Sequence, residues 1–435
     1  MTPMRLVRGI RYMFSKPENM SRRNASLAFL FITLITGLSF VSCYGPLSGP
    51  DPDMHSYATY AISTGQIGTN IRKFDDGRGN MVRFQFVTAP TAFTRAPMDN
   101  RVIADVLKPL NAYSAQRDAQ NASLAHGSQT LLETKQTRAN QYTPLSYLPQ
   151  AAGMSFGRLV GKSLWGQFQA ARLANLMTYL LLGWLAVWWA GRSCWLMVIA
   201  LAHPTIVFLA ASLSADSLTN ILAALVIAVA IRMGEWKDPG PLLQGLFVAG
   251  VALLGPLKLC YLPLSMLALV LPVFTWRRRI LLTILPWLIG LPIMGWFMLN
   301  YNKSNALYNI GDSVNHLLNH PIHDGMRLIN SVWAVTWRVF ADNPLMTVTL
   351  IVLLAVFVAN LHGMRVSRPR AWISLIAALL CVTATLGTLL LSWTEMNQPW
   401  GVIIAGFQER YLLPLLPLFA FTLIPRKPLT EGTRS

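Results

Sequence analysis

The chain has 435 residues, of which 53% are hydrophobic and only 12% are charged, and its formal net charge is +18. A soluble domain carries about 25% charged residues, and the apolar residues here form long blocks, so a water-soluble globular protein is excluded and lipid is the expected solvent for most of the chain. The 36 Lys and Arg residues, against 18 Asp and Glu, lie in short segments between the apolar blocks, which indicates the positive-inside bias of a membrane protein and not a nucleic-acid-binding face.

The first apolar block that is long enough to cross a bilayer, which takes about 20 residues, covers residues 25–44. The segment before it, 1–24, is basic and is expected in the cytoplasm, because short cytoplasmic segments of membrane proteins are rich in Lys and Arg. Its cations are Arg5, Arg8, Arg11, Lys16, Arg22 and Arg23.

A long polar stretch, 46–168, follows the first block and holds charges of both signs but no spanning segment. We therefore expect it on the extracytoplasmic side. Residues 53–64 predict a short helix. Residues 144–165 predict an interfacial segment, with Tyr147 at the depth of the lipid headgroups. The middle of the stretch, about 68–140, is polar and predicts an irregular cap.

Nine further apolar blocks follow, so the sequence predicts about ten transmembrane helices. These blocks cover approximately 170–190, 194–212, 217–233, 241–257, 259–275, 280–300, 345–362, 372–393 and 411–425. With this count, the basic clusters Arg277–Arg279 and Arg365–Arg370 fall on the side of the N-terminus, whereas one span more or fewer would misplace them. The stretch 301–344 then becomes a second extracytoplasmic loop.

The expected fold class is thus an all-α membrane protein, a polytopic bundle over residues 25–425. We expect it in a bacterial inner (plasma) membrane, and the positive-inside bias places both termini, including the tail 426–435, in the cytoplasm. The four cysteines have neither disulfide nor zinc spacing.

The spans contain almost no ionisable residues, and His203 beside Pro204 is interpreted as a packed helix-kink residue. Transporters that couple to ions usually place charges near the bilayer midplane, so a transporter is disfavoured. The ionisable residues instead gather at the outer helix ends, which indicates a site at the outer membrane interface. They are Asp51, Asp53, His55, Asp216, Lys258, Glu409 and Arg410.

The run PDPDMH at 50–55 places two carboxylates and an imidazole just after the first block. If a helix begins near Asp51, then Asp51 and His55 lie on one face of it. Asp51 or Asp53 could then accept the proton of an attacking hydroxyl while His55 orients the group. The alternative is an Asp that caps the helix, and the pattern alone does not decide between them.

Three other positions have a functional and a structural interpretation. Arg410, in the run QERY at 408–411, could clamp a phosphate or act as an interfacial anchor together with Tyr411. Lys258, in KLCY at 258–261, is either a phosphate contact or a snorkelling side chain. Asp216 alone slightly favours a helix cap. Because the sequence contains no P-loop, Rossmann or HExxH motif, a nucleotide donor is not expected.

Six short elements in this order resemble a bacterial family of multi-spanning membrane proteins, the domain of unknown function 2142, over about residues 25–424. They are PDPDMH at 50–55, PLSYLPQ at 144–150, RLAN at 172–175, SAD at 214–216, KLCY at 258–261 and QERY at 408–411. That family in turn resembles the GT-C glycosyltransferases, which take sugars from polyprenyl-phosphate carriers. One residue departs from the pattern: Pro52 stands where the family has Glu, so either Asp53 substitutes for it or the activity is altered.

The leading hypothesis is a GT-C-like glycosyltransferase that moves a sugar from a polyprenyl-phosphate carrier to a glycan or lipid of the cell envelope. Asp51 or Asp53 would be the general base, with His55 and Tyr147 orienting groups, and Arg410 and Lys258 would hold the phosphate. The remaining substrate-binding residues would be Asp216, Tyr261, Gln408 and Tyr411.

Two alternatives remain open from the sequence, a carrier or flippase for a lipid-linked saccharide and a non-catalytic membrane scaffold. No organic cofactor is expected, and a divalent metal between carboxylate and phosphate is compatible with the cluster but not required by it. The expected partners are membrane lipid, the lipid-linked sugar and the envelope acceptor, and no nucleic acid.

Overall fold

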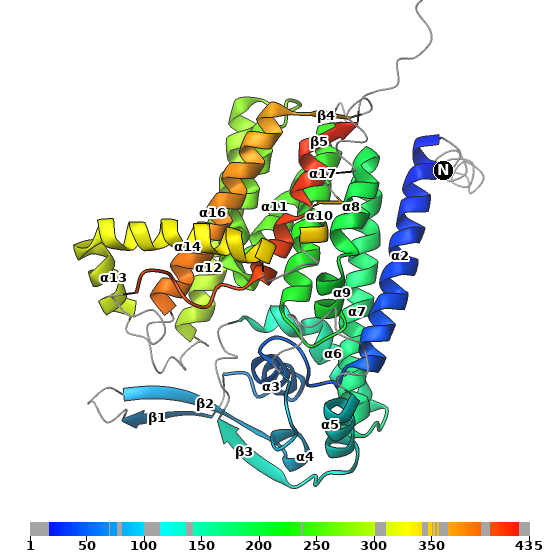
Figure 1. Cartoon of the computed structure of the whole chain (residues 1–435), viewed down its shortest axis with the longest axis vertical. Helices are drawn as coiled ribbons and strands as arrows, with labels where there is room; N and C mark the ends of the chain where they lie inside the picture. The colour runs from blue at the N-terminus through cyan, green and yellow to red at the C-terminus, as the bar shows by residue number, and fades with distance from the viewer. Residues whose placement is uncertain are drawn as a thin grey trace, which may run out of the picture.

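The computed structural model describes the chain over residues 17–68, 70–75, 81–99, 114–135, 142–235, 238–300, 310–341, 347–349, 351–352, 355, 364–392 and 401–425. Most of its regular structure is helical, and the long helices stand beside one another as a bundle (Figure 1). The segments between residues 44 and 164 gather at one end of this bundle, at the bottom of Figure 1, and the N-terminal end of helix α2 lies toward the opposite end.

Five helices of the described residues are long and apolar enough to cross a membrane. Each contains an apolar window of 18 residues, and a helix satisfies its backbone hydrogen bonds internally, as a bilayer requires. They are α2 (Pro17–Cys43), α7 (Leu164–Trp189), α10 (Asp216–Glu235), α12 (Trp276–Asn300) and α16 (Arg368–Ser392).

A sixth candidate span is broken. After the short 3-10 turn η4 (Gly191–Ser193), helices α8 (Cys194–Leu201) and α9 (Pro204–Ala210) follow each other at an angle of 77°. The imidazole of His203 accepts a hydrogen bond from the Thr205 amide at 3.2 Å at the start of α9. This confirms the interpretation of His203 as a residue of the helix kink.

Two shorter apolar helices correspond to the predicted fifth and sixth spans. They are α11 (Pro241–Leu257) and the 3-10 helix η5 (Leu259–Val270), and they meet at Lys258. Where a tenth span was expected, the chain forms η6 (Glu409–Leu415), α17 (Leu418–Thr422) and strand β5 (Leu423–Pro425). Pro414 and Pro417 interrupt the segment, because proline lacks the amide hydrogen that a continuous helix needs.

The count of ten spans is therefore not confirmed: by length and composition, the described residues hold five or six. The predicted block 345–362 lies largely outside the described residues. The segment 301–344, predicted as a loop, instead contains α13 (Ile310–Asn319) and α14 (Pro321–Ala341). Ahead of α16, strand β4 (Met364–Val366) pairs antiparallel with β5.

The polar stretch after α2 contains more regular structure than the sequence indicated. The short helix predicted over 53–64 is present as α3 (Pro52–Ser63). The prediction of an irregular cap is wrong for much of 68–140, because aromatic and β-branched residues alternate along MVRFQFV and build a sheet. Strands β1 (Ile71–Asp75), β2 (Met81–Pro90) and β3 (Leu131–Lys135) pair antiparallel in the order β1-β2-β3, with helices α4 (Thr91–Thr94) and α5 (Ser114–His126) between β2 and β3.

The segment expected along the membrane interface is helical in the structure. It forms η3 (Pro144–Tyr147) and α6 (Leu148–Leu159), and α6 packs against α7. Gly153 permits this approach, because a Cβ there would stand 2.4 Å from the Ala170 carbonyl oxygen. The Tyr147 side chain is fully buried within the protein, and its depth relative to the lipid headgroups stays a prediction.

A buried arginine joins the helix ends nearest the polar stretch. The guanidinium of Arg172, on α7, donates to the carbonyls of Phe40, Val41, Tyr44 and Ala211 at 2.8–3.1 Å. These carbonyls lie at the C-terminal ends of α2 and α9, where a cation is electrostatically favoured. The RLAN element at 172–175 thus has a structural role in holding these ends together.

Candidate functional site

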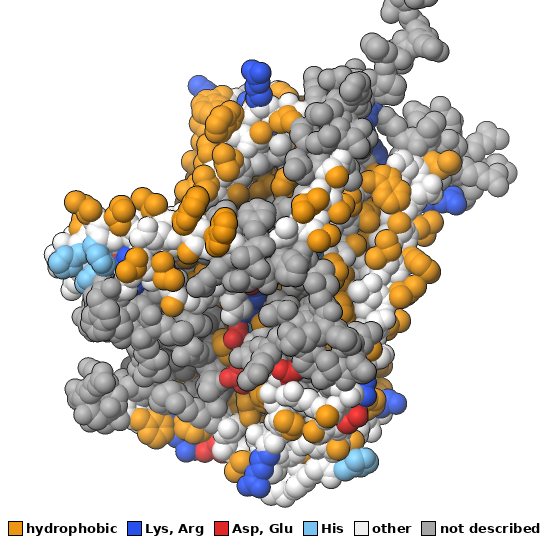
Figure 2. Space-filling view, viewed as in Figure 1, with side chains coloured by type: hydrophobic (Ala, Val, Ile, Leu, Met, Phe, Trp, Pro, Cys, Tyr) orange, Lys and Arg blue, Asp and Glu red, His pale blue; other side chains and the backbone are white. Residues whose placement is uncertain are grey.

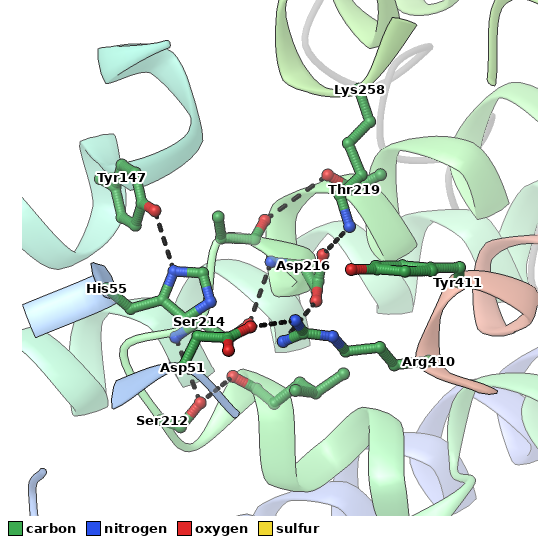
Figure 3. Close-up of polar contacts among 12 residues, drawn as sticks. Asp51, His55, Tyr147, Ser212, Ser214, Asp216, Thr219, Lys258, Arg410 and Tyr411 are labelled. Atoms are coloured by element: carbon green, nitrogen blue, oxygen red, sulfur yellow. Dashed lines mark hydrogen bonds and ion pairs between the residues drawn. The ribbon is translucent and has the colours of Figure 1, made fainter. Parts of the chain in front are cut away.

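Asp51 stands immediately before α3 in the left-handed backbone conformation, with φ 47° and ψ 53°. Its side chain makes no hydrogen bond to the helix amides, so the capping interpretation is wrong for this carboxylate. Asp51 forms an ion pair with Arg410 instead (Figure 3). Aspartate is among the few residues that adopt this conformation readily, and here its side chain contacts a residue more than 350 positions away.

Arg410 belongs to a continuous network of four charges. Its Nη1 lies 3.3 Å from the Asp216 carboxylate, and the other oxygen of Asp216 accepts a hydrogen bond from Lys258 (Figure 3). The side chains of Arg410 and Asp216 are 1% and 3% exposed, against 12% for Lys258 and 26% for Asp51. The network is neutral in sum, which buried charges require, because an unpaired buried ion is strongly destabilising.

A turn that contains Ser212 and Ser214 holds Asp216 at the start of α10. The Ser214 hydroxyl accepts from the Asp216 amide at 3.2 Å, and the Ser212 hydroxyl accepts from the Ser214 amide at 3.2 Å. The amide group of Asn175 donates to the Ser212 carbonyl at 2.9 Å. The serine hydroxyls thus hold the backbone that leads into α10, and the carboxylate of Asp216 pairs with Lys258 and Arg410.

The segment 143–150 ties three elements of the site together. The Thr143 hydroxyl donates to the Pro256 carbonyl of α11 at 2.7 Å, and Gln150 donates to the Ser214 carbonyl at 3.0 Å. Between them, the Tyr147 hydroxyl and His55 Nδ1 share a hydrogen bond of 2.8 Å. The PLSYLPQ element thus fixes α3, the start of α10 and the end of α11 relative to one another.

Aromatic rings surround the Lys258 ammonium. Its Nζ lies 4.4 Å from the ring centre of Tyr411 and 5.6 Å from that of Tyr142, within range for cation–π attraction. The Tyr261 hydroxyl donates to the Tyr411 carbonyl at 2.7 Å and so holds η6 in place. Lys258 is therefore a largely enclosed cation that is paired with Asp216. Tyr142 was missed from the sequence, although it stands two residues before the PLSYLPQ element.

His55 is buried and neutral at physiological pH. Burial, followed by the positive charge of Arg410, lowers the pKa of His55 to about 4. Burial also raises the pKa of Tyr147 well above its usual range. The pair therefore acts as a neutral donor–acceptor unit beside the four charges, and His55 contributes no cation to the site.

Several buried polar atoms of the site have no hydrogen-bond partner among the described residues. They are Arg410 Nε and Nη1, His55 Nε2, Gln150 Oε1 and Ser146 Oγ. Buried polar groups are normally satisfied, and each one that is not costs about 1–3 kcal/mol. Concentrated around one network, these atoms are candidates for contact with a bound polar molecule.

Two of the predicted site residues lie beside the network without joining it. Asp53 is in the first turn of α3 and half-buried, and the ion pairs around Arg410 use Asp51 instead. Gln408 precedes η6, where its carbonyl accepts from the Tyr411 amide at 3.0 Å. Within the described ranges, no group of three or more His, Cys, Asp or Glu side chains is placed to hold a metal ion. The two carboxylates of the network already pair with cations.

A family model described as "Predicted membrane protein (DUF2142)" matches residues 34–419, which include every residue of the network. Its description names no activity. Neither a curated protein nor a solved structure matches the chain.

Proposed function

Because the chain belongs to the DUF2142 family of predicted membrane proteins, we propose a function that operates at a membrane surface: transfer of a sugar from a polyprenyl-phosphate carrier to an acceptor in the cell envelope, by a GT-C-like enzyme facing away from the cytoplasm. The observation that supports it is the joining of Asp51, Asp216, Lys258 and Arg410 at one end of an apolar bundle. These four residues come from four distant segments.

The two cations suit a phosphate group. Arg410 retains a buried Nε without a hydrogen-bond partner among the described residues, and its Nη1 meets Asp216 only as an ion pair at 3.3 Å. An arginine fork binds phosphate oxygens in pairs. Lys258 brings a second positive charge through its contact with Asp216. A phosphate between them would be held by preorganised charges, which are most effective where water is excluded.

Asp51 suits the role of general base. It is the most exposed member of the network, at 26%, while its partner Arg410 is buried. As a phosphate engages Arg410, the carboxylate of Asp51 is released toward the acceptor. The acceptor oxygen bonds to the anomeric carbon while Asp51 takes the hydroxyl proton. The bond from that carbon to the phosphate oxygen breaks, and polyprenyl phosphate leaves with the electron pair.

His55 and Tyr147 would orient the acceptor. Their shared hydrogen bond leaves His55 Nε2 without a partner in the described structure. A neutral imidazole there can bond a sugar hydroxyl without adding charge. At the departure from the family pattern, Pro52, the preceding acid Asp51 keeps its ion pair with Arg410, so the proposal assigns the base to Asp51 and does not depend on an acid at position 52.

The test is a transfer assay with purified protein in proteoliposomes, supplied with labelled polyprenyl-phosphate sugars and an envelope lipid extract. Release of polyprenyl phosphate and the mass of the products are measured. We expect Asp51→Asn to lower the rate at least about 100-fold, the usual contribution of a general base. Asp53→Asn should have a far smaller effect.

The matched control is Asp118→Asn, since Asp118 is a surface carboxylate that is 64% exposed and paired with its neighbour Arg117. If Asp51→Asn transfers sugar as fast as Asp118→Asn, the assignment of the base is wrong. Movement of the labelled lipid across the bilayer without transfer would identify a carrier, and neither movement nor transfer would favour a scaffold.

A further inference from the structure

Helix α14 exposes a continuous apolar stripe. Ile322, Met326, Ile329, Trp333 and Trp337 are 83%, 52%, 61%, 74% and 69% exposed. Their spacing of three and four residues places all five on one face of the helix. Single exposed apolar residues are ordinary on protein surfaces, but a contiguous row with two tryptophans marks a surface that meets another apolar phase.

The opposite face of α14 is polar and buried. Asp324 and Arg327 are each 2% exposed and form an ion pair of 3.1 Å, and Ser331 is 1% exposed. A surface helix in water has the reverse arrangement, with its apolar face toward the protein and its charges outward. The inversion indicates that the medium around the outer face of α14 is hydrocarbon.

The orientation of α14 agrees with a position within the membrane plane. In Figure 1 it runs across α16 at a steep angle, whereas α12 and α16 run along the bundle. Exposed apolar side chains of α16, among them Trp372, Leu375 and Leu379, continue the surface, and Figure 2 shows apolar groups on both helices. The lipid-facing surface of the spans and the stripe are thus parts of one apolar exterior.

The end where α13 meets α14 is polar. His316 and His323 contact the Asp324 carboxylate at 2.9 Å and 3.5 Å, and the ring centres of His320 and His316 lie 4.7 Å apart, with the rings tilted by 41°. Figure 2 shows the histidines gathered at the edge of the molecule beside the apolar row. An apolar face with a polar end is the composition of a helix lying at a lipid interface.

We propose that α14 is a membrane-surface helix whose stripe lies among the acyl chains of one leaflet, the leaflet opposite the basic starts of α12 and α16. The partner of this surface is bilayer lipid. The inference concerns a part of the chain outside the charge network and holds whether or not the protein transfers sugar.

The inner face of α14 connects this lipid contact to the site. The Ser331 hydroxyl accepts from the Ile404 amide at 2.7 Å, and Leu328 and Val332 pack in one cluster with Tyr411. The segment 401–411, which carries Arg410, therefore rests on a helix that is anchored in lipid. Bilayer contact positions the network from outside the bundle.

The experiment is site-directed spin labelling of the full-length protein in vesicles of phosphatidylethanolamine and phosphatidylglycerol. Labels are introduced one at a time at Ile329→Cys and Trp333→Cys after the four native cysteines are replaced by serine or alanine. Collision with oxygen, which partitions into lipid, is compared with collision with a water-soluble nickel chelate. Leu379→Cys on α16 is the lipid reference, and Gln129→Cys, exposed before β3, is the water reference.

Both stripe labels are expected to give the oxygen-to-chelate ratio of Leu379→Cys, several-fold above that of Gln129→Cys. A ratio like that of Gln129→Cys would overturn the proposal, because the stripe would then face water. Low collision with both reagents would also overturn it, since a second copy or another protein would cover the stripe. Using two labels that lie one helix turn apart on the same face guards against a single variant that folds poorly.

Discussion

Helix α10 begins with Asp216 and ends with Glu235, and each acid pairs with two cations. At Glu235 the partners are Arg22 at 3.7 Å and Arg232 at 3.6 Å, and the carboxylate side chain is 25% exposed. At Asp216, which is 3% exposed, the partners are Lys258 and Arg410, themselves nearly buried. The same residue types thus gather around a carboxylate that is 25% exposed at one end and around a carboxylate that is 3% exposed at the other.

The helix dipole of α10 also acts differently on Asp216 and Glu235. A carboxylate is favoured at the N-terminus of a helix and disfavoured at its C-terminus, so Asp216 is stabilised by α10 while Glu235 needs its arginines to offset an unfavourable position. Lys and Arg are also common, in general, beside the cytoplasmic ends of membrane-spanning helices. The arginine and lysine at the other end have no such general reason to be there. Aromatic rings contact the Lys258 ammonium, and Arg410 Nε is buried without a hydrogen-bond partner among the described residues. The two ends of α10 show that charged residues alone do not mark a candidate site. The burial of the charged groups and the presence of donors without a hydrogen-bond partner distinguish it.

The largest expected difference between the two clusters follows from neutralising the acid of each. Asp216→Asn leaves Arg410 and Lys258 with too little negative charge in a buried place, and we expect it to lower the free energy of unfolding by about 3–5 kcal/mol. Glu235→Gln, at the more exposed carboxylate, should cost about 1 kcal/mol or less. Denaturation of the full-length protein in detergent, followed by tryptophan fluorescence, measures both.

A second variant checks the cause of that loss. Combining Asp216→Asn with Lys258→Met removes the excess positive charge and should recover part of the stability. Equal losses for Asp216→Asn and Glu235→Gln would show that the two clusters are energetically alike.

The next effect in size is a pH dependence confined to the buried network. Because the folded-state pKa of His55 is lowered from 6.5 to about 4, the unfolded chain binds a proton that the folded protein excludes between these values. Stability is therefore intact above pH 6.5 and falls as the pH drops toward 4, by at most about 3 kcal/mol.

The measurement is the melting temperature against pH for the wild type and for His55→Gln, whose difference isolates this group from the other acids and bases around it. His55→Gln should flatten the profile between pH 6.5 and 4. The exposed His126 provides the control, since His126→Gln should leave the profile as in the wild type. A profile of His55→Gln that parallels the wild type would contradict the assignment.

The smallest expected effect concerns two tyrosines, each of which donates one hydrogen bond to a backbone carbonyl. Tyr261 donates to the Tyr411 carbonyl and Tyr179 to the Leu201 carbonyl, both at 2.7 Å and both buried. Replacing either with Phe removes one hydrogen bond and should cost about 1–2 kcal/mol. Tyr261→Phe should in addition weaken polyprenyl-phosphate binding, because it loosens the segment that carries Arg410.

Calorimetric binding in detergent, set beside the melting temperatures, separates the two outcomes. Equal binding by both variants would mean that the contact of Tyr261 serves the bundle alone.

Most residues of the candidate site could be predicted from the sequence. Charged residues are rare in this chain, and the few near the predicted outer helix ends stood out against long apolar blocks. Asp51, His55, Asp216, Lys258 and Arg410 were singled out in this way, and the structure brings them together. Local pattern could not choose between Asp51 and Asp53, because that depends on a left-handed backbone angle at Asp51 and on a partner at the far end of the chain.

The sequence by itself determined that the chain is a helical membrane protein, since blocks of apolar residues that long have no other stable solvent. It also determined where charge was scarce. Only the tertiary structure decided that the segment at 409–425 is broken, that Tyr142 and Tyr147 are buried in the site, and that α14 presents its apolar face outward. Hydropathy records how apolar a segment is, whereas its direction, depth and partners arise from contacts between segments that are distant in the chain.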